Sequence, residues 1–156
     1  MIFFYITIII IAFSCSDTDN KEIVSYPWSN NSLEKVLFEN TNKDKIIFID
    51  FYSNSCEPCI EFEKKTLSDK RIINFANNYL ISIKINIDNK EGEKVFNDYD
   101  GSYVPLFVFL NERGEEIRRI EGYENADDFF DILEGILSQN IYITSLDNRD
   151  INGSTY

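Results

Sequence analysis

Residues 46–59 read IIFIDFYSNSCEPC, and the two halves of this segment differ in character. Positions 46–52 form an almost continuous run of branched and aromatic apolar residues, typical of a strand that is covered on both faces in a parallel sheet. Cys56 and Cys59 follow after a short polar turn, and Pro58 suits the first turn of a helix because its missing N–H would have no partner there. The segment therefore predicts a buried strand, a loop that carries two cysteines, and a helix that begins at the pair.

Hydrophobic periodicity predicts the other elements around this segment. Further strands are expected over 80–87, 105–110 and 115–120, with a hairpin turn at 111–114. Helices are expected after a cap at Asn31 or Ser32, from Pro58 to about Thr66, after a cap at Ser68 or Asp69, over 91–99, and from Asn125 to about residue 139. This order predicts a three-layer α/β domain in which a parallel strand pair and an antiparallel hairpin form one mixed sheet. The cysteine loop would lie at the carboxyl end of the strands, where reactive loops gather.

The 156 residues fit one domain with short appendages. Residues 1–13 are apolar apart from Thr7, a run that is too short to span a bilayer and suits the core of a signal peptide. With Cys15 they resemble a bacterial lipoprotein signal, whose cysteine is acylated; an ordinary secretory signal or an uncleaved anchor are the alternatives. We therefore divide the chain into a signal peptide (1–15), a polar tether (16–30), the folded domain (31–139) and a polar C-terminal tail (140–156).

Composition removes several classes of function. The 27 acidic and 15 basic residues give a net charge of −12, which repels phosphate backbones and makes nucleic acid an unsuitable partner. The chain has no histidine, which excludes Ser-His-Asp and Cys-His nucleophile pairs and imidazole metal ligands. Chemistry must therefore depend on Cys, Asp, Glu, Lys or Tyr, and we expect no cofactor.

The spacing of Cys56 and Cys59 favours redox chemistry. A helix N-terminus lowers the pKa of a thiol placed there, which makes Cys56 the expected exposed nucleophile and Cys59, one turn later, the shielded resolving thiol. A structural zinc site needs four ligands, whereas the chain, once Cys15 is assigned to the signal, offers two thiols and no imidazole, so we expect no metal. A purely structural disulfide that closes so short a loop would stabilise the fold by only roughly 2 kcal/mol.

Taken together, these motifs resemble the thioredoxin family over residues 33–138. Residues 50–59 resemble its active-site segment, with an acid six residues before the first cysteine and a proline before the second. Residues 84–88, KINID, resemble the family's second-strand motif, and Val104-Pro105 resembles the turn whose proline is cis and faces the disulfide. Gly114 and Gly122 match the glycines that flank the last strand.

The resemblance implies a thioredoxin fold and a set of roles. Cys56 would attack and Cys59 would resolve, while Asp50 would be a buried acid that manages the proton of Cys59. Lys84, on the neighbouring strand, would be its counter-charge. Val104 and Pro105 would bind an extended substrate segment. For Asp50 and Lys84, solvent-facing positions without a role are the alternatives.

The expected function is an exported thiol–disulfide oxidoreductase that exchanges disulfides with protein partners and draws electrons from an upstream thiol protein. Glu57 opposes the charge of the thiolate and no histidine cation stabilises it, which favours a reductant over a strong oxidant. We expect a monomer on the periplasmic side or the cell surface, held to the membrane by a lipid on Cys15. Two subgroups are similar: the membrane-tethered reductases of cytochrome c maturation and the exported domain of the disulfide-reductase relay. Ser55, where thioredoxins usually carry tryptophan, supports the alternative of a redox-inactive binding or scaffold lipoprotein.

Overall fold

A computed structural model describes residues 25–40 and 45–152 of the chain, with side chains up to Tyr142. Its centre is a four-stranded sheet in the order β2-β1-β3-β4. The strands are β1 (Ile46–Tyr52), β2 (Leu80–Asn86), β3 (Leu106–Leu110) and β4 (Glu116–Glu121). β1 pairs in parallel with β2 and antiparallel with β3, and β3 and β4 form the hairpin. The mixed thioredoxin-type sheet that the sequence predicts is thus confirmed.

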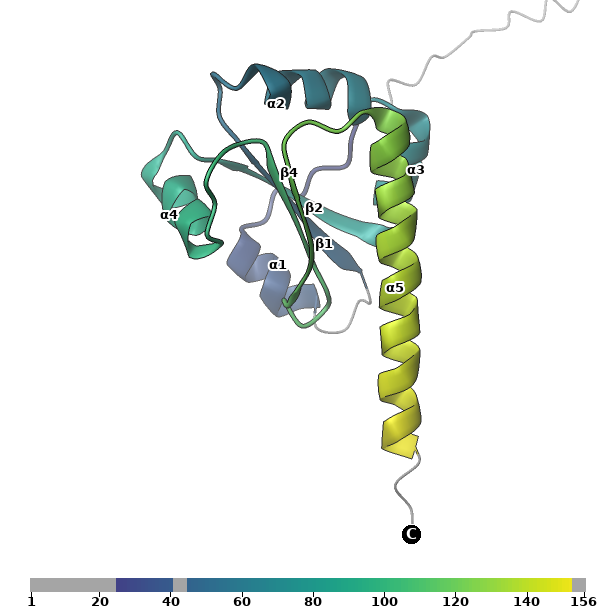
Figure 1. Ribbon diagram of the computed structural model, residues 1–156. Helices are drawn as coiled ribbons and strands as arrows, with labels where there is room; N and C mark the ends of the chain where they lie inside the picture. Colours follow the sequence, from purple (N-terminus) through teal and green to yellow (C-terminus); the bar gives the residue numbers. More distant parts are fainter. Residues whose placement is uncertain (1–24, 41–44, 153–156) are drawn as a thin grey trace, which may run out of the picture.

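Helices cover both faces of this sheet (Figure 1). They are α1 (Leu33–Asn40), α2 (Glu57–Glu61), η1 (Phe62–Thr66), α3 (Lys70–Tyr79), α4 (Lys90–Asp98) and α5 (Ala126–Asn152). Successive side chains of β1 point to opposite faces, so Ile47 and Ile49 join α1 and α4 in one apolar cluster while Phe48 joins η1, α3 and α5 in the other. The result is a three-layer domain whose central strand is buried from Ile46 to Phe51.

The predicted helix from Pro58 to Thr66 proves to be two pieces. After α2 the backbone widens into the π-helical turn η1, in which the N–H of Leu67 donates to the carbonyl of Phe62, 3.0 Å away. Thr66 is fully buried at the end of this turn, and its hydroxyl donates to the carbonyl of Glu124 at 2.7 Å. No residue type marks a π-turn, so hydrophobic spacing predicts a single helix for the segment.

Two predicted domain boundaries are wrong. Residues 140–152, expected as part of a polar tail, continue α5, which runs past the rest of the domain as one helix (Figure 1). The sequence has no proline or glycine between positions 136 and 152 that would end the helix. At the other end, Trp28 forms a parallel bridge with Ser82 of β2, and Tyr26 and Trp28 pack on the core, so the tether ends before them.

Cys15, the predicted signal peptide and the tether as far as residue 24 lie outside the described residues. Within the described ranges, no helix is both long enough and apolar enough to cross a membrane.

Candidate active site

The two cysteines lie at the start of α2, just after the turn that follows β1. They form a disulfide with an S–S distance of 2.06 Å, and Cys56 is the N-cap residue of α2. The backbone N–H of Cys59 donates to Sγ of Cys56 at 3.2 Å. Cys56 is half-buried whereas Cys59 is only 7% exposed, which is the asymmetry expected of an attacking and a resolving thiol.

Asp50 is a buried acid on the strand that leads to the pair. It is 3% exposed, and its Oδ1 has no hydrogen-bond partner among the described residues. Burial raises the pKa of Asp50 to about 7, Lys84 opposes this rise and Glu63 adds to it. A carboxyl that titrates near neutrality can accept and return a proton under physiological conditions.

Lys84 lies directly beside Asp50, because these two residues are partners in the parallel register of β1 and β2. Its ammonium forms an ion pair with Glu63, with Nζ and Oε2 2.6 Å apart. The same nitrogen lies 4.3 Å from the ring centre of Tyr52 and 5.7 Å from that of Trp28. Lys84 is therefore held in one position by an acid and two aromatic faces.

Glu63 is a site residue that the sequence analysis missed. It follows Cys59 by four positions, a spacing that places two residues on the same face of a helix, so the signal was present in the sequence. Tyr26 was missed as well, because it was assigned to the tether. Its hydroxyl lies 3.0 Å from Oγ of Ser82, and burial together with the nearby Asp50 carboxylate raises the pKa of the Tyr26 phenol.

Val104 and Pro105 lie at the same edge of the sheet as the cysteine loop. Phe51, near the end of β1, pairs with Leu106, the first residue of β3, so the residues before β3 come beside the residues after β1. The Val104–Pro105 peptide bond is cis. The carbonyl of Pro105 accepts a hydrogen bond from the N–H of Gly122 at 2.9 Å. The topology thus brings the predicted substrate-binding residues and the cysteine pair to one edge.

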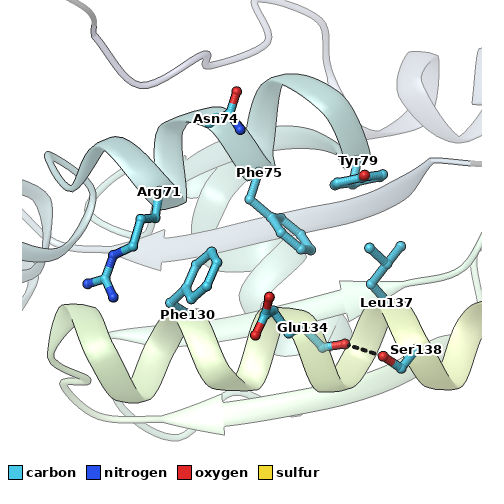
Figure 2. Close-up of a pocket in the computed structure, with 8 residues that line it drawn as sticks. All are labelled: Arg71, Asn74, Phe75, Tyr79, Phe130, Glu134, Leu137 and Ser138. Carbon is cyan, nitrogen blue, oxygen red and sulfur yellow. Dashed lines mark hydrogen bonds between the residues drawn. The ribbon is translucent and has the colours of Figure 1, made fainter.

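A pocket of about 360 Å³ lies elsewhere, between α3 and α5 (Figure 2). It shares no residue with the cysteine site. Arg71, at one end of it, is paired with Asp69 and Asp127 and lies over the ring of Phe130. The contacts of Arg71 with Asp127 and Phe130 link α3 to α5. Within the described part of the chain, no cluster of three or more Cys, Asp or Glu side chains is arranged to hold a metal ion.

The chain is similar to proteins of a known family. A family model for a thioredoxin-like domain matches residues 33–136. The thiol:disulfide interchange protein DsbD of Campylobacter jejuni is 33% identical over 116 residues, which cover 74% of this chain and 20% of that protein. DsbD of Haemophilus influenzae is 28% identical over 112 residues, covering 70% and 19%. The chain thus spans about a fifth of the length of these curated relatives.

Solved structures share the fold at lower sequence identity. A thioredoxin from Thermus thermophilus matches with a TM-score of 0.65 and 21% identity, covering 74% of this chain and 90% of that one. The C-terminal domain of Neisseria meningitidis DsbD, in its oxidised form, matches with a TM-score of 0.53 and 18% identity, covering 65% and 86%.

Proposed function

This chain belongs to the thioredoxin-like family, and we propose that it is a thiol–disulfide oxidoreductase that reduces disulfides of protein partners outside the cytoplasm. The observation that carries the proposal is the Cys56–Cys59 disulfide at the start of α2, in which Cys56 is half-buried and Cys59 is buried. The DsbD proteins it is similar to are named for thiol:disulfide interchange.

The reaction begins from the reduced pair. The thiolate of Cys56 attacks one sulfur of a partner disulfide, forms a mixed disulfide, and releases the first partner thiolate. Cys59 loses its proton to Asp50 through an intervening water, and its thiolate attacks Sγ of Cys56. The second partner thiolate leaves, so two electrons pass to the partner and the Cys56–Cys59 disulfide remains. An upstream thiol protein returns the two electrons.

The local charges favour the reducing direction. Glu57, inside the motif, is exposed and opposes the charge of a thiolate on Cys56. Because no histidine exists in the chain, no imidazolium can stabilise the reduced thiolate, the feature that makes a dithiol pair strongly oxidising. Val104 offers its backbone to an extended partner segment beside the disulfide.

The site of action follows from the sequence before the domain. Residues 1–15 direct export, Cys15 carries a lipid that holds the protein to a membrane, and the domain works in the periplasm or at the cell surface as a monomer. The similarity to DsbD supports a periplasmic location. Metabolic labelling with a radioactive fatty acid, comparing the natural chain with Cys15→Ala, tests the anchor: equal labelling of both would contradict it.

Two measurements test the activity. The reduced protein is expected to reduce insulin, and Cys56→Ser is expected to abolish this. Equilibration with glutathione measures the direction: a reduction potential as high as about −180 mV would show an oxidant rather than a reductant.

The alternative of a redox-inactive scaffold has one observation in its favour. Ser55 is exposed where an apolar contact surface for partners is usual in thioredoxins. Equal and negligible insulin reduction by the natural chain and Cys56→Ser would favour the scaffold.

A further inference from the structure

The turn that leads into the cysteine pair is held by a carboxylate from a different part of the chain. Ser53 Oγ donates to Oδ1 of Asp88 at 2.7 Å, and the backbone N–H of Asn54 donates to Oδ2 at 2.8 Å. Both oxygens of Asp88 are therefore committed to residues 53 and 54, which lie 35 and 34 positions earlier in the chain. These bonds keep the Asp88 carboxyl ionised, since they lower its pKa below the usual range.

The network continues to Ser55, next to the first cysteine. Ser53 Oγ accepts from the backbone N–H of Ser55 at 3.3 Å and lies 3.1 Å from the Ser55 hydroxyl. Because the single hydroxyl hydrogen of Ser53 is used on Asp88, the Ser55 hydroxyl must be the donor in that contact. Ser55, the residue that departs from the family pattern, thus takes part in building the turn. The N–H of Cys56 then donates to the carbonyl of Ser53 at 3.2 Å.

Asp88 is itself firmly placed. Its N–H donates to Oδ1 of Asn86 at 2.8 Å, and the preceding Ile87 donates to the carbonyl of Tyr52 at 2.9 Å, which extends the pairing of β1 and β2 by one step. Asn89 next to it caps α4 through Gly92. The carboxylate is therefore fixed to the end of the sheet and to the start of a helix, two rigid supports for the turn.

We propose that Asp88 is a positioning residue for Cys56: it clamps residues 53–55 so that Sγ of Cys56 stays over the N–H of Cys59. This inference rests on the thiol chemistry proposed above. A thiolate that keeps this N–H contact is stabilised, whereas a mobile turn would let the sulfur move away from it.

Positioning and simple charge predict opposite results for the same variant. Asp88→Ala removes a negative charge near the thiolate, and by charge alone this would lower the pKa of Cys56. Loss of the clamp would raise that pKa, because the sulfur would lose its hydrogen-bond donor. Other acids and phenols on the surrounding segments, Glu57, Tyr103 and Glu121, are unchanged in the variant, as is the buried Asp50.

The experiment measures the pH profile of alkylation of Cys56 by iodoacetamide in the reduced full chain, read at Cys56 by peptide mass. Asp88→Ala is expected to raise the pKa of Cys56 and to slow its alkylation at pH 7 about tenfold. This is less than the roughly hundredfold loss of rate that a 1 Å misplacement of a reacting group can cause. Ser53→Ala keeps every charge and is expected to act in the same direction. Asp88→Asn keeps one of the two acceptor oxygens, so it should hold part of the clamp and give a rate between those of Asp88→Ala and the natural chain.

Two controls distinguish loss of the clamp from loss of charge and from loss of folding. Asp98→Ala, on α4, removes the same charge from an exposed ion pair with Lys94 and should leave the profile unchanged. Urea unfolding of each variant shows whether the domain is intact; if Asp88→Ala does not fold, Ser53→Ala and Asp88→Asn decide the question. A lowered pKa in Asp88→Ala, or no change in Ser53→Ala, would overturn the clamp. Inert Cys56 in the natural chain would instead contradict the proposed function.

Discussion

At the scale of single residues, burial is the strongest influence on the chemistry of Asp50. Its carboxyl group has almost no access to water, and one oxygen has no hydrogen-bond partner among the described residues. The pKa therefore rises from 3.8 to about 7, although Lys84 favours the charged form. Desolvation therefore changes the pKa of Asp50 more than the attraction to Lys84 does. The ammonium of Lys84 also forms an ion pair with Glu63.

The raised pKa of Asp50 predicts how stability depends on pH. Between pH 3.8 and about 7 the folded protein keeps a proton that the unfolded chain has lost, so the free energy of unfolding should fall as pH rises through this window. Asp50→Asn removes this loss. The free energy of unfolding of the variant minus that of the natural chain should increase by about 2–4 kcal/mol from pH 4 to pH 8, measured by urea unfolding of the oxidised protein. Parallel pH profiles of the two proteins would contradict the assignment.

Glu63 and Lys84 should move the titration of Asp50 in opposite directions. Lys84→Met removes the favourable cation and should raise the pKa of Asp50 further, whereas Glu63→Gln removes a repelling charge and should lower it. Carbon-detected NMR of the Asp50 carboxyl measures both. Lys94→Met, which removes an exposed cation from α4, serves as the control and should change nothing. A shift of the same sign in both variants would mean that packing, not charge, sets the pKa.

At the scale of elements, short polar side chains fix where the helices begin. Asp69 accepts from the N–H of Arg71 and caps α3, Asn89 accepts from the N–H of Gly92 and caps α4, and Asn125 accepts from the N–H groups of Asp127 and Asp128. A cap at Ser68 or Asp69 and a helix start at Asn125 were predicted, because capping is a local property that depends on residue type. The contact of α4 with β2 is different, since it depends on the missing side chain of Gly92.

Gly92 allows α4 to touch the end of β2. A Cβ at this position would collide with the carbonyl oxygen of Asn86, a backbone atom that cannot move aside alone. Gly92→Ala should therefore lower the free energy of unfolding by about 1–3 kcal/mol, as overpacking does. Gly135→Ala is the matched control: no atom lies within 4 Å of its Cβ, and the helical position is exposed. It should stabilise the domain by about 0.5–1 kcal/mol. Equal effects of the two changes would refute this account.

At the scale of the whole molecule, Tyr26 and Trp28, which precede α1, lie against β2 and the core. Trp28 stacks on Phe48 with ring centres 6.2 Å apart, lies 4.6 Å from Tyr26, and covers Lys84. Tyr26 reaches Ser82 of β2 through its hydroxyl. Tyr26 and Trp28, which were predicted to belong to the tether, therefore form a wall beside Asp50 and its neighbour Lys84.

Trp28→Ala tests the importance of this wall. The variant should lose about 2 kcal/mol of unfolding free energy, less than a fully buried tryptophan because Trp28 is half-buried. Ile141→Ala, which shortens an apolar side chain that is 60% exposed on α5, should cost less than about 0.5 kcal/mol. Chemical unfolding of both variants at one pH gives the comparison. A negligible loss at Trp28 would show that the segment contributes little to the domain.

Much of the fold and of the site could be predicted because the signals are local. The continuous apolar run of β1, the alternation along β2, the cap residues and the cysteine spacing all lie within a few positions of what they specify, and the thioredoxin fold and family were confirmed. The end of α5 was mispredicted because residues 144–150 are mostly polar and were assigned to a tail, although nothing between residues 136 and 152 breaks a helix. The π-turn at η1 has no sequence mark at all.

The sequence by itself determined the strand that carries Asp50, the position of Cys56 and Cys59 after it, and the family to which the chain belongs. Only the tertiary structure decided the surroundings of these groups: the pairs Lys84–Glu63, Ser53–Asp88 and Tyr26–Ser82 join residues 21, 35 and 56 positions apart. The physical reason is that burial and charge act through space. The pKa of a carboxyl and the position of a sulfur therefore depend on distant segments that meet only when the chain folds.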